Sequence, residues 1–344
     1  MRRLLSHFGW PERAAVLLLM VWVVWAGVAT ALVGRILLPT SPYVVAPVAL
    51  AVGVVLGRLV APQASHRATG LTLLALSALV LLPVLGSYGA AKAPLFYANA
   101  NAALAVQLMA LCGLVMVRTT GRQRAMVAVG AVLALAAVAA NYSKAGFAVA
   151  VPAFVVVVAT AWWPARRRWV PIVAAFVGLI TVTSAAMTIA ALARHEGWPE
   201  WALIAFDPAR QTMWQDAIGL WERHPVLGAG TGTFQQVSRL GYDADTAAAH
   251  SSVLQIGAET GWVGVALFAG IVIAGLAWAC RGTPENAVIG VAAWSALLVH
   301  SFADHLLEFV PVMLAAGLVL GWSGSQPRAS ALLDVSVEQS PATR

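Results

Sequence analysis

Apolar runs long enough to cross a membrane dominate this 344-residue sequence and restrict the folds open to it. A helix needs about 20 apolar residues to cross the hydrocarbon core. Only 10% of the residues are charged, against about 25% in an average soluble domain, which excludes an ordinary soluble enzyme. The pattern predicts an all-α fold, a polytopic membrane bundle of about 10 transmembrane helices with one large, partly helical extracytoplasmic loop. The expected spans are roughly 14–34, 43–62, 69–86, 99–117, 125–141, 146–163, 169–193, 254–279, 285–302 and 306–323.

The distribution of basic residues predicts the orientation of the chain. With the N-terminus inside, the cytoplasmic segments hold 14 of the 21 lysines and arginines and the outer segments hold 7. Four of those 7 lie in the single long loop, and long loops count little in the positive-inside rule. We therefore expect both termini on the cytoplasmic side. The net charge of +7 then reflects membrane topology and gives no reason to expect nucleic acid as a partner.

A polar segment at 194–253 interrupts the apolar pattern and divides the chain. It follows seven predicted spans in 1–193 and precedes three more in 254–323, and a cytoplasmic tail at 324–344 is expected to be disordered. The segment holds half of all the acidic residues and three of the seven histidines. Loops of this length are usually functional or disordered. Tryptophans spread through it favour a folded extracytoplasmic loop domain.

Two local signals predict structure inside this loop. Asp207 and Pro208 have the positions of an N-cap and a first helical residue, and the helix should run to about Glu222, before Pro225 ends it. Three glycines then alternate with small residues, which allows the backbone unusual dihedral angles and close approach to its neighbours. Neither a Walker-type phosphate loop nor a dinucleotide-binding fold fits, because no Gly-Lys-Ser/Thr and no strand–helix alternation follow. The glycines are Gly228, Gly230 and Gly232.

The loop returns to the membrane at His250. Glu259 follows inside the next predicted span, where a carboxylate is costly and faces a protein interior or a cavity. The three loop histidines are far apart in the sequence and match no metal-binding spacing. We therefore predict no metal site and no cofactor.

The ordered set of polar residues resembles the O-antigen ligase and polymerase superfamily, over about 85–323. In chain order, the matching elements are Asn99 with Asn101, the run Asn141-Tyr142-Ser143-Lys144-Ala145-Gly146, Arg210 with Trp214, His224-Pro225 with the glycine loop, His250 with Glu259, and His300-Ser301-Phe302-Ala303-Asp304-His305. Two positions depart from the expected pattern. Lys144 stands where the family usually has Arg, and Ser251 stands where Asn is expected after the histidine.

The resemblance implies a glycosyltransferase. Its substrates would be an undecaprenyl-diphosphate-linked glycan donor and a hydroxyl-bearing glycolipid or glycan acceptor, in cell-envelope polysaccharide biosynthesis. It would act without metal, among membrane lipids, on the outer side of the bacterial cytoplasmic (inner) membrane. The alternatives are a glycan polymerase of the same superfamily, a bicarbonate-type transporter and an inactive scaffolding paralogue. No convincing internal repeat of the kind common in carriers occurs, and polar residues gather on the outer side, which favours chemistry there.

The resemblance also suggests roles for individual residues. Arg210 is the first candidate for binding the diphosphate and for catalysis, because a guanidinium binds phosphate oxygens in pairs. The alternative is an ion pair between Arg210 and an Asp or Glu. Lys144 is the second candidate for the diphosphate. His250 is the candidate general base for the acceptor hydroxyl, or it orients the acceptor or the diphosphate.

Other polar or small residues are expected to support this site or to shape the loop around it. Asp304 and His305 can form a polar pair, which we place among the supporting residues. The remaining supporting residues are Trp214, His224, Gly228, Gly230, Gly232, Glu259, Asn99 and Asn101.

Overall fold

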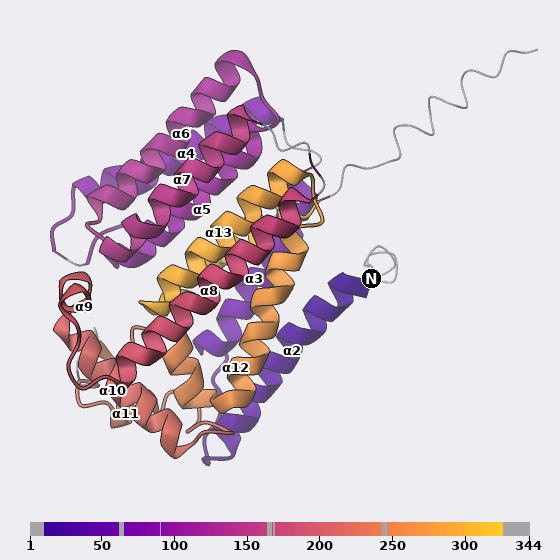
Figure 1. Ribbon diagram of the computed structural model, residues 1–344. Helices are drawn as coiled ribbons and strands as arrows, with labels where there is room; N and C mark the ends of the chain where they lie inside the picture. The colour runs from indigo at the N-terminus through magenta and orange to yellow at the C-terminus, as the bar shows by residue number, and fades with distance from the viewer. Residues whose placement is uncertain are drawn as a thin grey trace, which may run out of the picture.

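The computed structural model describes residues 10–61, 65–89, 91–163, 167, 169–242 and 246–325. Within these residues the chain is all-helical, which confirms the predicted fold class (Figure 1). The tail expected beyond Ser325 lies outside the described residues, as do Arg2, Arg3, Arg166, Arg168, Arg328 and Arg344, which entered the orientation argument. The long helices are α2 (Trp10–Ala31), α3 (Pro42–Val60), α4 (His66–Leu85), α5 (Ala98–Met116), α6 (Gly121–Ala140), α7 (Lys144–Trp162), α8 (Val170–Arg194), α12 (Ser252–Ala279) and α13 (Pro284–Phe302).

In the described part of the chain, these 9 helices are long and apolar enough to cross a membrane. Each overlaps a predicted span to within a few residues. The tenth is shorter than predicted, because a 3-10 helix, η2 (Leu306–Glu308), precedes the 14-residue helix α14 (Val310–Ser323). The eighth predicted span is not one regular helix, since Gly261 breaks α12 with a φ of 66°.

Helix α14 packs closely against α3 because both helices present glycines at the contact. A Cβ atom added at Gly53 would lie 2.3 Å from the carbonyl oxygen of Leu314, and one added at Gly321 would lie 2.1 Å from that of Val54. Small residues four positions apart let helix backbones approach closely in membranes. This contact holds α14, which follows the turn at 303–309, directly against α3.

The polar segment forms a cap of short helices at one end of the bundle. Figure 1 shows α9 (Glu200–Ala205), α10 (Pro208–Arg223) and α11 (Phe234–Val237) at the end away from the N-terminus. The predicted start of α10 is confirmed, because the Asp207 side chain accepts a hydrogen bond of 2.8 Å from the Ala209 amide. The buried ring of Trp214 lies 5.1 Å from both Trp198 and Phe206, measured between ring centroids. These aromatic residues belong to the hydrophobic core that the cap shares with the bundle.

The glycine loop fills the break in α12. The amides of Ala229 and Gly230 donate to the carbonyls of Ala258 and Glu259 at 2.9 and 3.0 Å, so the loop satisfies backbone groups near the break. A Cβ at Gly228 would lie 2.3 Å from the Glu259 carbonyl carbon, and its φ is 76°. Only glycine fits this position without strain.

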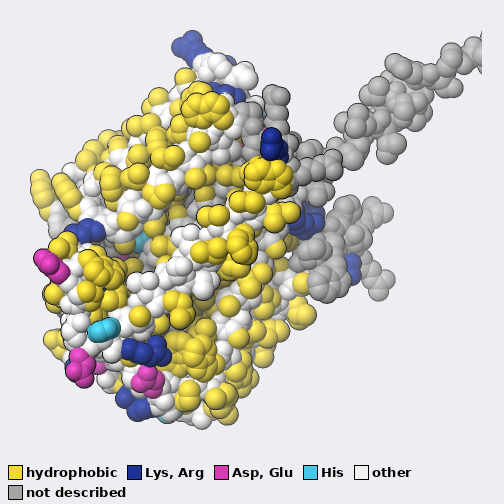
Figure 2. Space-filling model, viewed as in Figure 1, with side chains coloured by type: hydrophobic (Ala, Val, Ile, Leu, Met, Phe, Trp, Pro, Cys, Tyr) yellow, Lys and Arg dark blue, Asp and Glu magenta, His cyan; other side chains and the backbone are white. Residues whose placement is uncertain are grey.

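The surface agrees with a membrane protein. Figure 2 shows hydrophobic side chains over the long helices on the face in view, while the acidic side chains in view lie near the end that carries α9 to α11 and basic side chains lie at both ends. Such a wide apolar surface is stable only against lipid or another apolar partner.

Candidate active site

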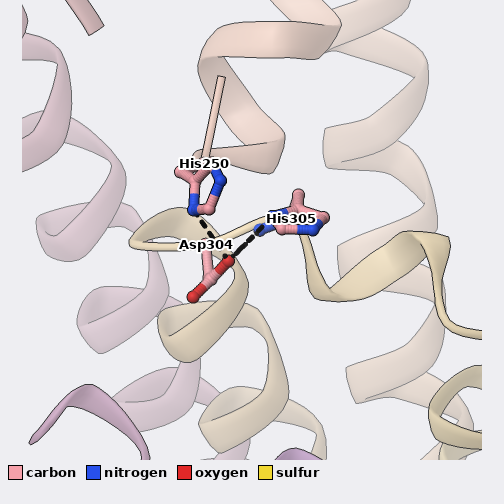
Figure 3. Close-up of side chains that lie close together, drawn as sticks. All are labelled: His250, Asp304 and His305. Carbon is pink, nitrogen blue, oxygen red and sulfur yellow. Dashed lines mark hydrogen bonds and ion pairs between the residues drawn. The ribbon is translucent and has the colours of Figure 1, made fainter. Parts of the chain in front are cut away.

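Three cationic or ionisable side chains converge on the carboxylate of Asp304. The Arg210 Nη2 atom lies 3.0 Å from Oδ2, and the Nδ1 atoms of His305 and His250 lie 2.9 and 3.5 Å from Oδ1. Figure 3 shows both imidazoles next to the same oxygen of the carboxylate. Asp304 is only 1% exposed. Burial of an acidic side chain is favourable only when it is paired in this way.

Two further side chains complete the shell around this carboxylate. The Tyr97 hydroxyl donates a hydrogen bond of 2.7 Å to Oδ1 and lies 3.3 Å from His250 Nδ1. The side-chain nitrogen of Asn99, Nδ2, donates a hydrogen bond to Oδ2. We call these six residues the Asp304 cluster: Tyr97, Asn99, Arg210, His250, Asp304 and His305.

The cluster joins segments that are distant in the sequence. Tyr97 and Asn99 come from the start of α5, Arg210 from the first turn of α10, and His250 from the residues just before α12. Asp304 belongs to the turn between α13 and η2, and its carbonyl accepts from the Ser252 amide at 3.1 Å. The site therefore exists only once the cap and the bundle pack together.

His250 is held in an uncommon backbone conformation. Its φ is 47°, in the left-handed region that non-glycine residues rarely adopt. The indole of Trp214 donates a 3.2 Å hydrogen bond to the His250 carbonyl. Residues held in such conformations are concentrated at functional sites. Trp214 thus fixes the main chain of a candidate catalytic residue.

The charges in the cluster shift one another's protonation. Burial alone would raise the pKa of Asp304, but the hydrogen bond from His305 and the charge of Arg210 hold that pKa well below its usual range. Burial lowers the pKa of His305, but the hydrogen bond and charge of Asp304 outweigh burial and raise that pKa. Burial and the charge of Asp304 raise the pKa of Tyr97. The cluster therefore favours an ionised Asp304 facing a protonated His305 and a neutral Tyr97.

An apolar cleft opens next to the cluster. Its empty volume is about 660 Å³ including the space at its mouth, and its walls come mainly from α2, α3 and α12. His305 and Glu308 both line it, so one imidazole belongs to the cleft and to the cluster. A second apolar cleft shares Leu19, Leu50, Ile271 and Trp294 with the first and extends it along α2 toward Ala15. The two clefts therefore adjoin each other, and we call the pair, which begins at the Asp304 cluster, the apolar groove.

Several residues predicted for the site lie outside the cluster. Lys144 Nζ donates to the Ile204 carbonyl at 2.7 Å, so the structure does not bring it to Asp304. Asn101 holds the loop before α5, since its Nδ2 donates to the Lys92 carbonyl at 2.7 Å and its Oδ1 accepts from the Leu95 amide at 3.0 Å. His224 is exposed at the end of α10.

Glu259 and the glycine loop support the site from a distance. The buried Glu259 carboxylate accepts a 3.1 Å hydrogen bond from the Phe234 amide, which anchors the loop just after its last glycine. Gly228 and Gly230 are buried, and Gly232 meets no neighbouring heavy atom within 4 Å of an added Cβ. These contacts hold the glycine loop against α12, and the predicted shaping role of these residues stays a prediction.

One group of side chains in the cluster has the composition of a metal site. The ligand atoms of His250, Asp304 and His305 lie within 4.8 Å of one another, and two imidazoles with one carboxylate suit a transition metal. The sequence spacing hid this group, because His305 comes from a different element than the loop histidines. The Arg210 guanidinium and the Tyr97 hydroxyl already occupy the same carboxylate, so a cation would compete with them. Metal independence stays a prediction.

The sequence argument underestimated Asp304 and omitted Tyr97. Asp304 and His305 stood among the supporting residues, although they are ionisable groups at the end of a predicted span, where such groups mark function. Tyr97 lies two residues before Asn99, and no local signal distinguishes it from an interfacial aromatic.

Comparison with known families gives one match. Residues 129–269 match the family model described as O-antigen ligase. No curated protein matches the chain. The matched segment contains Arg210, His250 and the glycine loop, whereas Tyr97 and Asp304 lie outside it. Residues 129–269 are thus similar to the O-antigen ligase family, and the chain is a multi-pass helical membrane protein.

Proposed function

We propose that this protein is an O-antigen ligase-type glycosyltransferase. It transfers a glycan from an undecaprenyl-diphosphate carrier to an acceptor hydroxyl, on the outer side of the bacterial cytoplasmic membrane. The observation that carries the proposal is the convergence of Arg210, His250 and His305 on one buried carboxylate at the mouth of an apolar cleft. A lipid-linked diphosphate needs both features, cations for its head and an apolar groove for its tail.

The donor fits this arrangement with its lipid tail in the groove and its diphosphate at the cluster. The prenyl tail lies in the groove beside α2 and α3, and the diphosphate lies at its mouth, next to Arg210 and His305. Arg210 uses one nitrogen for Asp304 in the structure, and a guanidinium has five N–H donors. It can therefore hold Asp304 and phosphate oxygens together. Protonated His305 supplies the second positive charge. It takes the role that the sequence analysis predicted for Lys144, which lies outside the cluster.

His250 is suited to activate the acceptor. Its Nδ1 faces Asp304 and Tyr97, which orients the ring as a buried carboxylate orients a catalytic histidine. The opposite ring nitrogen, Nε2, takes the proton of the acceptor hydroxyl as its oxygen bonds to the anomeric carbon of the glycan. The bond between that carbon and the diphosphate oxygen breaks, and the electron pair leaves with undecaprenyl diphosphate, whose charge Arg210 and His305 stabilise.

The test is transfer by the full-length protein in proteoliposomes. The assay supplies an undecaprenyl-diphosphate oligosaccharide and a panel of glycolipid and glycan acceptors, without ATP. Arg210→Ala and His250→Ala are expected to lower the initial rate by about a hundredfold or more, as losing a charge-stabilising or acid–base group does. Matched controls are Arg239→Ala, which removes an exposed loop arginine paired with Asp216, and His224→Ala, which removes an exposed loop histidine. Both controls should keep wild-type rates.

Other outcomes of the same assay separate the alternatives. Full activity in both cluster variants contradicts the site assignment. A ladder of products made from donor alone identifies a polymerase, and flux of labelled bicarbonate without transfer identifies a transporter. Loss of activity in EDTA, restored by one divalent metal, would place a cation on His250, Asp304 and His305.

A further inference from the structure

We propose that Phe96 and Tyr142 form a binding subsite for the sugar rings of a glycan substrate, beside the Asp304 cluster. The proposal deepens the proposed function and rests on it. Phe96 directly precedes Tyr97 of the cluster, and Tyr142 lies in the turn between α6 and α7. Neither residue lines the apolar groove assigned to the lipid tail.

Both aromatic residues combine high exposure with an uncommon backbone conformation. Phe96 is 72% exposed with a φ of 56°, and Tyr142 is 85% exposed with a φ of 55°. In the described residues, His250 is the only other non-glycine residue with a positive φ. Glycine adopts this conformation without penalty. An exposed aromatic residue at such a position costs stability relative to glycine and buries little apolar surface in return. A functional role therefore explains Phe96 and Tyr142 better than stability does.

The exposed aromatics at the opposite end of the bundle provide a contrast. Trp163 and Trp169 flank the connection between α7 and α8, and Trp163 is 75% exposed. Their φ values are −123° and −81°, which any residue adopts. An interfacial belt of aromatics therefore needs no strained backbone in this protein, and the belt explanation does not account for Phe96 and Tyr142.

Hydrogen bonds hold the two aromatic segments together. Asn101 donates to the Lys92 carbonyl at 2.7 Å and to the Asn141 side chain at 3.3 Å, and so joins the loop before α5 to the turn after α6. The Lys92 ammonium donates to the Ala140 carbonyl at 2.5 Å and lies 4.5 Å from the centre of the Tyr142 ring. The loop that carries Phe96 is thus fixed to the turn that carries Tyr142.

A pyranose ring is the ligand that suits such a pair. Its C–H face is apolar and complements the negative face of an aromatic ring, while its hydroxyls remain in water. Rigid aromatics on fixed turns lose little side-chain entropy on binding. The shared ligand chemistry is an extended glycan, which can come from the acceptor or from the sugar chain of the donor.

The chain allows a test that separates binding from folding. Glycine relieves the backbone strain at both positions, so Phe96→Gly and Tyr142→Gly remove the rings while favouring the native backbone. The detergent-solubilised full-length protein is tested on an array of defined bacterial-envelope oligosaccharides. Wild type should bind at least one glycan, and each glycine variant should bind it about tenfold more weakly, the loss expected for one stacked ring. Phe96→Tyr and Tyr142→Phe keep a ring and should bind as wild type does.

The controls make each outcome decisive. Trp163→Ala removes an equally exposed aromatic at the other end and should not change glycan binding. The melting temperatures of the glycine variants should equal or exceed that of wild type. Absence of glycan binding by wild type, or unchanged binding by both glycine variants, overturns the proposal.

Kinetics in the transfer assay then identify the source of the glycan. A higher KM for the acceptor alone assigns the subsite to the acceptor, and a higher KM that grows with donor glycan length assigns it to the donor. Active transfer with unchanged KM values in both glycine variants refutes this subsite and leaves the proposed function intact. Glycan binding that depends on the two rings, without any transfer by wild type, supports the subsite and contradicts the proposed function.

Discussion

Two carboxylates are almost fully buried toward the same end of the bundle, and they are used in different ways. Glu259 accepts a hydrogen bond from a backbone amide of the segment it anchors. Asp304 is surrounded by ionisable and polar side chains from three other segments. The backbone amide that bonds Glu259 is fixed in the main chain. The imidazole and guanidinium side chains that bond Asp304 can also form hydrogen bonds with a substrate. We therefore expect Glu259 to maintain the fold and Asp304 to organise the proposed chemistry.

The sharpest way to break this comparison is to neutralise Asp304. Asp304→Asn is expected to lower the transfer rate by about a hundredfold or more, because Arg210 and both histidines lose the charge that orients them. The measurement is the initial rate in proteoliposomes, with the melting temperature as a check on folding. A folded variant that keeps more than about a tenth of the wild-type rate would remove Asp304 from the mechanism.

Replacing Arg210 by lysine tests whether the guanidinium shape matters. An ammonium is a point charge and cannot hold Asp304 and a phosphate through a planar fork. Arg210→Lys should reduce kcat/KM for the lipid-linked donor by about ten- to a hundredfold, or about 1.4 to 2.7 kcal/mol. An unchanged kcat/KM would show that only the positive charge is needed.

The third prediction concerns the pH dependence of donor binding, which should depend on Asp304 through His305 and should not depend on Glu259. Asp304 raises the pKa of His305 despite burial, so the imidazolium persists above its ordinary pKa of about 6.5. The stability from this pairing is complete below about pH 6.5 and is lost as pH rises through the raised pKa. Asp304, whose pKa is depressed, loses its contribution only in stronger acid. We expect KM for the donor to rise by up to about tenfold through the His305 transition.

His305→Gln provides the control for that profile. It should show a higher KM at low pH and no transition in the alkaline direction, whereas Glu259→Gln should keep the wild-type profile. A His305→Gln profile identical to that of wild type would assign the transition to another group.

For Glu259 we expect an effect on stability and little effect on turnover. Glu259→Ala leaves the buried Phe234 amide without its partner, which costs about 1–3 kcal/mol of unfolding free energy. The kcat of the folded protein should stay within about twofold of wild type. Chemical denaturation and the transfer assay measure the two quantities separately. A large fall in kcat without loss of stability would reverse the roles assigned to the two carboxylates.

The smallest effect is expected at Lys144. Its ammonium bonds the Ile204 carbonyl at an exposed position, and such contacts contribute little. Lys144→Ala should change KM for the donor by less than about threefold. A larger increase would support the prediction from the sequence that Lys144 binds the diphosphate, through a movement of α9.

The sequence predicted the helices better than it predicted their partners. Membrane spans are local features that length and apolar content reveal, so nine of them could be located to within a few residues. The start of α10 was equally local, since it depends on Asp207 and Pro208. The convergence of Arg210 and His250 on Asp304 depends on how the cap packs against the bundle, and no spacing in the sequence records that contact.

The failures have the same origin. The tenth span was predicted four residues too early, because the turn at Asp304 and His305 is set by polar contacts made across the fold. The break at Gly261 was missed, since a glycine in an apolar run is compatible with a straight helix. The candidate metal group escaped notice because its third ligand lies 55 residues beyond His250 in the chain.

The glycine contact between α3 and α14 couples the lipid-facing wall to the reaction centre. Helix α3 contributes Tyr43, Pro47 and Leu50 to the cleft, and α14 begins a few residues after Asp304. With backbones in direct contact, neither helix can tilt alone. In the proposed function, a carrier that displaces α3 as it enters or leaves would also displace α14 and the turn before it, so the arrival of the tail would be transmitted to the residues proposed to act on the head.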